Sequence, residues 1–263
     1  MKKYLKLYPY YVSRSIKARL SYRFDAFVGI FGFLISNTLI FSTLYLTISA
    51  IPSLNGWDIN KMGFLYGFYL IPKSLDHILS DEIWQLSNGG ITRGILDKYL
   101  IKPINPLFQL VAEMIQLEGL GELFLGIIFL SVFTPTLNIS YEFYQIVLLA
   151  ICAFFSMWFF FAIKLIFASI SFWTKRSIEV MTTIYEFSNF AKYPIDIFSG
   201  VIRFIITYIL PFSVVIFFPI RALLFGGNLW LVTLYVVIAS VVMFLISLFV
   251  WTKGLSRYES AGS

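Results

Sequence analysis

The chain has 263 residues, of which 59% are hydrophobic and only 13% are charged. Soluble globular domains carry roughly twice that charged fraction, and several apolar stretches reach the roughly 20 residues that cross a bilayer as a helix. The formal net charge is +6, but the bases gather at the ends of apolar segments, which is the topology signal of membrane proteins. These values exclude an ordinary soluble domain, argue against a nucleic-acid partner, and predict an all-α integral membrane protein.

Residues 4–23 form a basic segment before the first long apolar run. Apolar residues recur in it at every fourth position: Tyr8, Val12, Ile16 and Leu20. A basic helix with one apolar face is typical of helices that lie in the headgroup plane, in contact with membrane lipid. The alternative is a basic tail that only sets topology. The segment lacks the apolar core and small-residue cleavage site of a signal peptide, so we expect no cleavage there.

Six membrane spans are predicted from the apolar runs. Five of them cover residues 26–51, 62–79, 107–133, 143–170 and 229–251, and the remaining one lies between residues 177 and 219. The second span contains Pro72, so we expect a helix that is kinked or locally unwound at that residue.

Residues 178–219 are too many for one span and allow two interpretations. Either a surface helix precedes a span at 195–219, or a span at 177–193 precedes two short re-entrant helices that are broken by prolines. These prolines are Pro194, Pro211 and Pro219. Segment length alone does not decide between the two interpretations.

Lysine and arginine are concentrated in the N-terminal segment, in residues 79–106, at residues 175–176 and in the tail after residue 251. The connection between the first two spans has only Lys61, and the connection at 134–142 has no base. By the positive-inside rule, both termini and residues 79–106 are predicted to lie on the cytoplasmic side.

The stretch from Leu79 to Pro106 is the one long polar interruption between the apolar runs. It is longer than a simple turn needs, and its middle is predicted to be a short amphipathic helix. Three apolar residues lie on one side of this helix and three charged residues surround the rest: Ile91, Ile95 and Leu96, then Arg93, Asp97 and Lys98. These residues are the candidate docking site for a soluble partner. The alternative is a solvated connector.

Ionisable side chains inside the predicted spans are costly in lipid and need a partner or water. Counting inward from the outer ends of the second and third spans places Lys73 at the depth of Glu122, and His77 at the depth of Glu118. Both sets step by four residues, so each set lies on one helix face. We therefore predict the pairs Lys73–Glu122 and His77–Glu118. The alternative is that these side chains only reach interfacial water.

A second polar face is formed by Glu179 and Glu186, which lie two helical turns apart. These glutamates are candidates for a transport pathway. An interfacial position is an equally good interpretation of the same spacing.

No motif for catalysis or cofactor binding is found in the sequence. The chain lacks the Gly-rich phosphate loop that ends in Lys and Ser or Thr, and one histidine, His77, with one cysteine, Cys152, cannot make a structural zinc site. No Ser–His–Asp arrangement is supported, since His77 lies in a predicted span. We expect the chain itself to be non-catalytic and to bind no cofactor or metal, and Cys152 to serve only in packing.

Two stretches resemble a known family. Residues 192–226, KYPIDIFSGVIRFIITYILPFSVVIFFPIRALLFG, contain YP, PF and P-x-R-x-L-L-x-G elements before the last span. Residues 89–110, GGITRGILDKYLIKPINPLFQL, follow the second span. With the basic helix before the first span, these features resemble the permease subunits of ABC-2 type transporters, in particular a branch of bacterial permeases of about this length.

The resemblance implies six spans, with the fifth at 177–193 and an outer re-entrant pair at 194–226. It implies a second permease subunit, identical or related, and a dimer of separate ATPase subunits that use ATP and Mg²⁺. The ATPase would dock on a coupling helix at about 88–99, within a cytoplasmic region at 80–106. Export across the bacterial cytoplasmic membrane is the implied activity.

Two other classes of protein are compatible with the composition. A secondary transporter or channel would need internal inverted repeats and helices that are broken at mid-membrane. A membrane enzyme or an assembly scaffold would have no ATPase partner.

Overall fold

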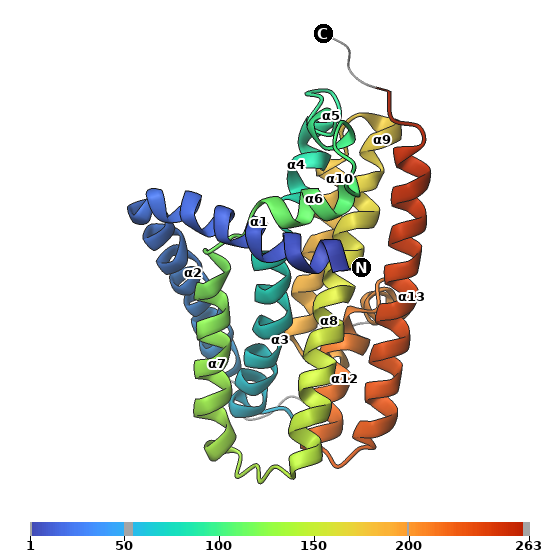
Figure 1. The fold of residues 1–263 in the computed structure, drawn as a ribbon. Coiled ribbons are helices and arrows are strands. Elements are labelled where there is room, and N and C mark those ends of the chain that lie inside the picture. The colour runs from blue at the N-terminus through green and yellow to red at the C-terminus, as the bar shows by residue number, and fades with distance from the viewer. Residues whose placement is uncertain (1, 50–54, 199, 260–263) are drawn as a thin grey trace.

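The computed structural model describes residues 2–49, 55–198 and 200–259, and all regular structure within these ranges is helical. Four long helices run side by side: α3 (Ile59–Ser80), α7 (Gly119–Thr136), α8 (Phe143–Ser169) and α13 (Leu229–Leu255) (Figure 1). Residues 83–102 and the C-terminal end of α13 lie at the same end of this bundle, which we call the tip end.

The basic N-terminal segment is one helix, α1 (Lys2–Ser21). α2 (Arg23–Ser49) follows it and packs against α7 and α3. α1 lies across the long helices rather than along them (Figure 1), and its Tyr4, Tyr8 and Tyr11 rings pack around Phe108. Residues 50 and 51 of the first predicted span lie outside the described residues.

α3 begins after Asp58, whose carboxylate accepts the Lys61 backbone N–H at 2.9 Å and so caps the helix. The chain remains helical through Pro72, so the local unwinding predicted there does not occur. The proline removes one helical hydrogen bond, but α3 is packed between α7 and α8. Burial of its side chains against both neighbours outweighs that loss.

The segment predicted as one span at 107–133 is instead two helices. α6 (Pro106–Glu113) lies across the bundle beside α1, and α7 begins only at Gly119 (Figure 1). Two backbone N–H groups at the break donate to acceptors outside the segment: Ile115 to the Ser15 hydroxyl at 2.7 Å and Gln116 to the Ile78 carbonyl at 3.0 Å. These distant acceptors stabilise the non-helical backbone, and the local apolar pattern carries no sign of them.

α8 is followed by α9 (Ser171–Thr174) and by α10 (Ile178–Glu186), which continues into the 3-10 helix η2 (Phe187–Lys192). The fifth predicted span, 177–193, therefore corresponds to nine residues of α10 and six of η2. A straight span needs roughly 20 helical residues, so this segment is short for one.

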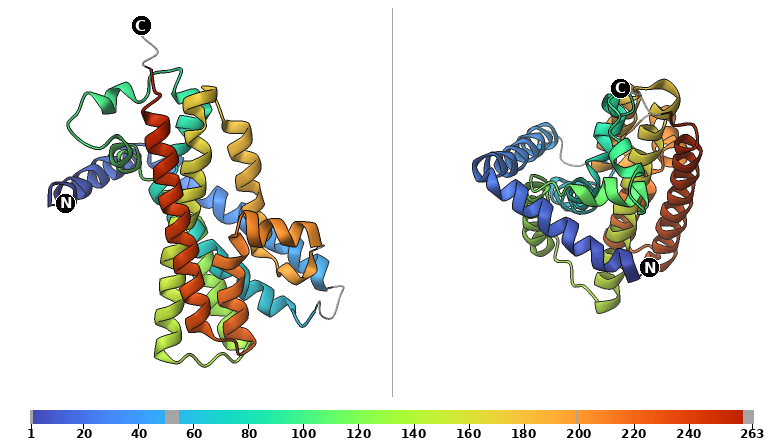
Figure 2. Two further views of the ribbon diagram at one scale, coloured as in Figure 1. Left: turned by 90° about the vertical axis from the view of Figure 1, so that its right-hand side faces the viewer. Right: turned by 45° about the horizontal axis from the view of Figure 1, so that its top comes forward.

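The chain then turns back on itself. The 3-10 helix η3 (Ile195–Ile197), α11 (Gly200–Phe204) and the π-helix η4 (Ile205–Ile209) precede α12 (Phe212–Leu224). The α11–η4 segment and α12 meet at an angle of 99°, and Figure 2 shows the first of them directed across the bundle. A single straight helix at 195–219, one of the two interpretations of this region, is not formed.

Four helices in the described part of the chain are long and apolar enough to cross a membrane, and the count is five if the bent pair α11–α12 is one span. The four are α2, α7, α8 with α9, and α13. α3 has the length of a span but carries charged side chains. Length and composition thus support four of the six predicted spans, since the bent pair α11–α12 lies in the region 194–226 that was predicted to be re-entrant.

At the tip end, residues 83–102 form α4 (Ile83–Gln85), the π-helix η1 (Leu86–Gly90) and α5 (Asp97–Leu100), which are joined by turns. Their apolar side chains share one cluster with α8, α9 and α13. A separate and larger apolar cluster is built mainly from α3, α8 and α12. The tip is therefore a small folded unit on the bundle rather than a loose connector.

Candidate functional site

A buried carboxylate lies between α2, α3 and α7. Glu122 is 3% exposed, and three polar side chains converge on it. Lys73 Nζ lies 4.0 Å from Oε1, His77 Nδ1 lies 3.3 Å from Oε2, and the Asn37 amide donates to Oε1 at 3.2 Å. We call Asn37, Lys73, His77 and Glu122 the α3–α7 cluster. A carboxylate this deeply buried needs such partners, because an unpaired buried charge is strongly destabilising.

Local structure brings the cluster together. Lys73 and His77 are four residues apart on α3 and so lie on one face. Glu122 is in the first turn of α7, where the helix dipole favours a negative charge. Gly121 lies against the backbone of α2, since a Cβ added there would overlap the carbonyl oxygen of Ile30. The close approach of α2 brings the Asn37 amide within reach of Glu122.

The structure brings Lys73 and Glu122 together, but it does not pair His77 with Glu118. His77 contacts Glu122, and Glu118 forms an ion pair with Arg19 at 3.3 Å. The depth count compared only the second and third spans, and therefore left out α1 as a source of a competing cation. Arg19 takes Glu118 at the start of α7, and it also hydrogen-bonds Gln116 in the break before that helix.

A second polar cluster lies on another face of α3 and was not predicted. Lys164 on α8 is fully buried, with Nζ 2.9 Å from Asp76 Oδ2 and 3.0 Å from Asp81 Oδ1. The Tyr185 hydroxyl of α10 donates to Asp76 Oδ2 at 3.1 Å, and the Ser80 hydroxyl donates to Oδ1 at 2.6 Å. We call Asp76, Asp81, Lys164 and Tyr185 the α3–α8 cluster.

A signal for the α3–α8 cluster was present in the sequence. Lys164 is the one charged residue of the predicted span at 143–170, and Asp76 is an acid on α3 for which no partner was proposed. Charges of opposite sign within spans usually pair. The cluster ties the end of α3, just before the tip, to α8 and α10.

The tip does not contain the amphipathic helix predicted at about 88–99. Gly89 and Gly94 have φ values of 74° and 64°, a conformation that glycine adopts without strain. They divide the segment into turns, and only Asp97–Leu100 is α-helical.

The six predicted docking residues have different environments. Ile91 and Leu96 are buried in the tip's own apolar cluster, and Ile95 packs against it. Arg93 is exposed and donates to the Asn88 carbonyl at 2.7 Å. Lys98 pairs with Glu113 at 2.9 Å at the surface. The apolar face therefore holds the tip together and is not available to a partner.

Asp97 joins the tip to the C-terminal tail, because its Oδ1 accepts the Tyr258 hydroxyl at 2.8 Å. Burial and this carboxylate raise the pKa of Tyr258 to about 12. The apolar side chains that the tip does expose are Leu100 (45%) and Ile101 (82%), next to the exposed base Lys102. These residues were not among the predicted docking residues, because they fall outside the helical periodicity.

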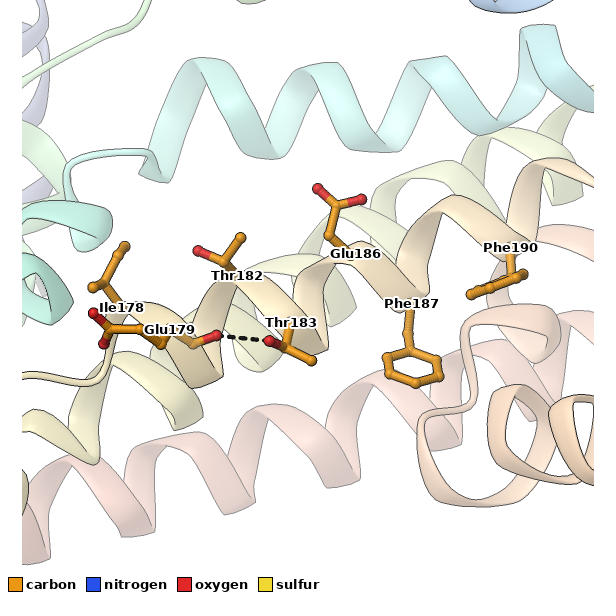
Figure 3. A pocket seen from close by; sticks show the side chains of 7 residues that line it. All are labelled: Ile178, Glu179, Thr182, Thr183, Glu186, Phe187 and Phe190. Atoms are coloured by element: carbon orange, nitrogen blue, oxygen red, sulfur yellow. Dashed lines mark hydrogen bonds between the residues drawn. The ribbon is translucent and has the colours of Figure 1, made fainter.

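The face of α10 and η2 that carries Glu179 and Glu186 lines an open cavity of about 640 Å³. Figure 3 shows both glutamates along the same side of the helix, with Phe187 and Phe190 further along. Glu179 pairs with Arg176 at 2.8 Å, and its backbone carbonyl accepts the Thr183 hydroxyl at 2.8 Å. The structure thus places the two predicted residues on one accessible surface.

That surface is connected to the α3–α7 cluster through α3. Glu186 accepts a hydrogen bond from Asn189, whose side-chain oxygen accepts the Tyr69 hydroxyl at 3.3 Å. The Lys73 ammonium lies 5.2 Å from the centre of the Tyr69 ring. A smaller cavity of about 340 Å³ is lined by Lys73 and Glu122 of the cluster and by small residues of α2: Gly29, Gly32 and Ser36.

No group of three metal-ligating side chains comes together in the ranges that the structure describes. The family model described as "ABC-2 family transporter protein" matches residues 31–262. Comparison with curated proteins gives no match.

Proposed function

Because the chain belongs to the ABC-2 family of transporter proteins, we propose that it is the permease subunit of an ATP-driven exporter in the bacterial cytoplasmic membrane. The family match over most of the chain carries this proposal. Two charged clusters within a bundle of apolar helices add to it, because ionisable groups at membrane depth usually mark a transport pathway. The chain itself carries out no hydrolysis.

The partner in this proposal is a dimer of separate ATPase subunits that bind ATP and Mg²⁺. They dock on the tip, with Leu100, Ile101 and Lys102 as the contact surface in place of the buried Ile91 and Leu96. An exposed apolar pair beside a base at the end of a folded unit suits a contact with a soluble protein. Arg93 and Lys98 are also exposed on the tip and form the rim of the proposed contact.

The tip end faces the cytoplasm in this arrangement. Bases from the tip, from α9–α10 and from the C-terminal tail lie there, in agreement with the positive-inside rule. α1 then lies in the headgroup plane with its bases toward lipid, and both termini are cytoplasmic. The bent pair α11–α12 belongs to the outer half.

The substrate path runs between this chain and a second permease, identical or related. Its wall on this side consists of the α10 face with Glu179 and Glu186, the α3–α7 cluster, and the small residues of α2. This concave region is accessible in the single chain and presents charges of both signs, which a partner permease would enclose.

Coupling follows from the position of α3. α3 ends next to the tip, and the α3–α8 cluster fixes its end to α8 and α10. A displacement of the tip by closure of the ATPase dimer would move α3 as a rigid element. That movement would shift Lys73 and His77 against Glu122 and change the path between the two permeases.

The docking surface is tested by purifying the complex with an affinity tag on the permease and measuring the bound ATPase. Ile101→Asp should reduce bound ATPase by about tenfold or more, since a charge in the centre of an apolar contact costs several kcal/mol. Lys102→Glu should reduce it less, and Lys253→Glu, at the same end but on α13, should leave it unchanged. Normal ATPase binding by Ile101→Asp would reject the docking surface. A lone chain that transports without any ATPase would make the protein a secondary transporter.

A further inference from the structure

A large apolar cavity that has no part in the proposed path lies beneath the N-terminal half of α1. Its volume is about 790 Å³, and it is lined by residues of α1, α3, α6, α8 and α13, with Asp76 of the α3–α8 cluster at its α3 side. Residues that define it include Leu5 and Tyr8 of α1, Val111 of α6, Trp158 of α8 and Phe244 of α13. Almost all of its lining is carbon, and a cavity of this kind does not hold ordered water.

The cavity continues as a groove along the seam between α8 and α13. A second cavity of about 320 Å³ shares Trp158 and Phe244 with the first and extends to Phe154 and Val241. Phe154 and Phe161, which line the two cavities, are seven residues apart on α8, or about 10 Å along the helix axis at 1.5 Å per residue. Since α8 and α13 both run toward the tip end (Figure 1), the groove leads from α1 toward the middle of the bundle.

Bases of α1 flank the cavity, since Lys3 and Lys6 are next in sequence to the lining residues Tyr4 and Leu5. α1 has no acidic residue, and its bases are Lys2, Lys3, Lys6, Arg14, Lys17 and Arg19. The Lys3 ammonium donates to the Pro103 carbonyl at 3.1 Å, which uses one of its three N–H groups. The hydroxyl of Tyr4, a lining residue, accepts the backbone N–H of Asn105 at 3.3 Å and so holds α1 against the start of α6. Lys6 is exposed on the same stretch of α1.

We infer that this cavity binds one anionic phospholipid of the surrounding leaflet, with its headgroup at Lys3 and Lys6 and one acyl chain in the cavity and the α8–α13 groove. Lysines near a membrane surface attract anionic lipid headgroups. The apolar groove beyond them can hold the acyl chain of the same lipid. The lipid would fix α1 to α8 and α13. The inference rests on the membrane position of α1 proposed above, but not on transport or on an ATPase partner.

The test measures lipid that the full-length protein retains. The purified chain is stripped of lipid in detergent, exposed to vesicles of phosphatidylglycerol or of phosphatidylcholine, washed, and weighed intact by native mass spectrometry. We expect one retained phosphatidylglycerol per chain. Each of the two lysines contributes about fivefold to anionic-lipid affinity, so retention of phosphatidylcholine should be roughly 25-fold weaker. Equal retention of both lipids, or of neither, overturns the inference.

Variants separate the cavity from the rest of the membrane surface. Val111→Phe fills the cavity and should lower phosphatidylglycerol retention by about tenfold or more, because the acyl chain loses its burial. Val132→Phe makes the same change at an exposed position of α7, where Val132 is 51% exposed, and should have no effect. The double variant Lys3→Gln and Lys6→Gln should remove the preference for phosphatidylglycerol. Retention that survives Val111→Phe overturns the site.

A second measurement needs no change to the cavity wall at Val111. After washing, phosphatidylglycerol with a brominated acyl chain should quench part of the tryptophan fluorescence, and Trp158→Phe should remove that part. Quenching that persists in Trp158→Phe would place the lipid elsewhere. If Val111→Phe instead changes the number of protein copies per particle and leaves retained lipid unchanged, the occupant is a second chain and the inference is wrong.

Discussion

Removing the Lys164 ammonium should destabilise the fold more than any other single change to a lysine of this chain. Its Nζ lies 2.9 Å from Asp76 Oδ2, and both side chains are fully buried. Lys164→Met keeps the length and apolar stem of the side chain but leaves Asp76 without a cation. Loss of one partner from a buried ion pair costs about 3–5 kcal/mol. Asp81 is partly exposed and can be solvated, so most of the loss comes from Asp76.

A matched change and a double variant make this prediction specific. Lys61→Met removes a lysine from the surface pair with Asp58, where N–O is 3.6 Å, and should cost about 1 kcal/mol or less. Asp76→Asn combined with Lys164→Met removes both charges and should recover at least about 2 kcal/mol of the loss, because no unpaired charge remains. The amide oxygen that this double variant introduces on α3 would still accept a hydrogen bond from the Tyr185 or Ser80 hydroxyl.

The assay is reversible unfolding in mixed micelles, followed by far-ultraviolet circular dichroism, on these three variants and the wild-type chain. The reasoning is refuted if Lys164→Met and Lys61→Met lose similar free energy of unfolding. It is also refuted if the double variant is no more stable than Lys164→Met alone.

Three further predictions concern a close contact, the tip and the pathway. Gly121→Ala should lower the free energy of unfolding by about 1–3 kcal/mol, because the added Cβ would overlap the backbone of α2. Gly32 faces open space, so Gly32→Ala should change the free energy of unfolding by less than about 0.5 kcal/mol in the same assay. The pKa of Tyr258 in the folded chain is about 12, above its ordinary value of 10. The contact with Asp97 therefore stabilises the tip below pH 10, and this contribution is lost as the pH rises toward 12. The difference between the phenolate absorbance titrations of wild type and Tyr258→Phe should show this late ionisation step, and a step near pH 10 would contradict the prediction. Glu122→Gln should reduce ATP-dependent transport by about tenfold or more while insertion and ATPase binding persist, since the α3–α7 cluster loses its only carboxylate; transport at the wild-type rate would remove this residue from the path.

Uninterrupted apolar runs predicted helices well in this chain. α8 and α13 coincide within a few residues with the predicted segments 143–170 and 229–251, because nothing polar breaks them. The all-helical class and the membership of the ABC-2 family, inferred from residues 89–110 and 192–226, are likewise confirmed. The local apolar pattern was sufficient to predict a helix where the backbone hydrogen bonds are all made within that helix.

Two of the failures have the same physical cause, which is an interaction with a residue that is distant in sequence. The break before α7 depends on Ser15 and Ile78 as acceptors, and the assignment of Glu118 to His77 failed because Arg19 competes for it. A count along two helices cannot include a third helix that crosses them. The apolar residues of the predicted amphipathic helix at the tip do lie together, but they form the interior of a small folded unit and not a docking surface.

The proposed function requires that this chain work together with separate ATPase subunits. The most direct test is the intact mass of the complex purified in mild detergent from its native membrane. The account predicts two permease subunits with two ATPase subunits, and loss of the ATPase from the Ile101→Asp complex. A particle that contains this chain alone, in every mild detergent tried and with ATP present, would contradict it.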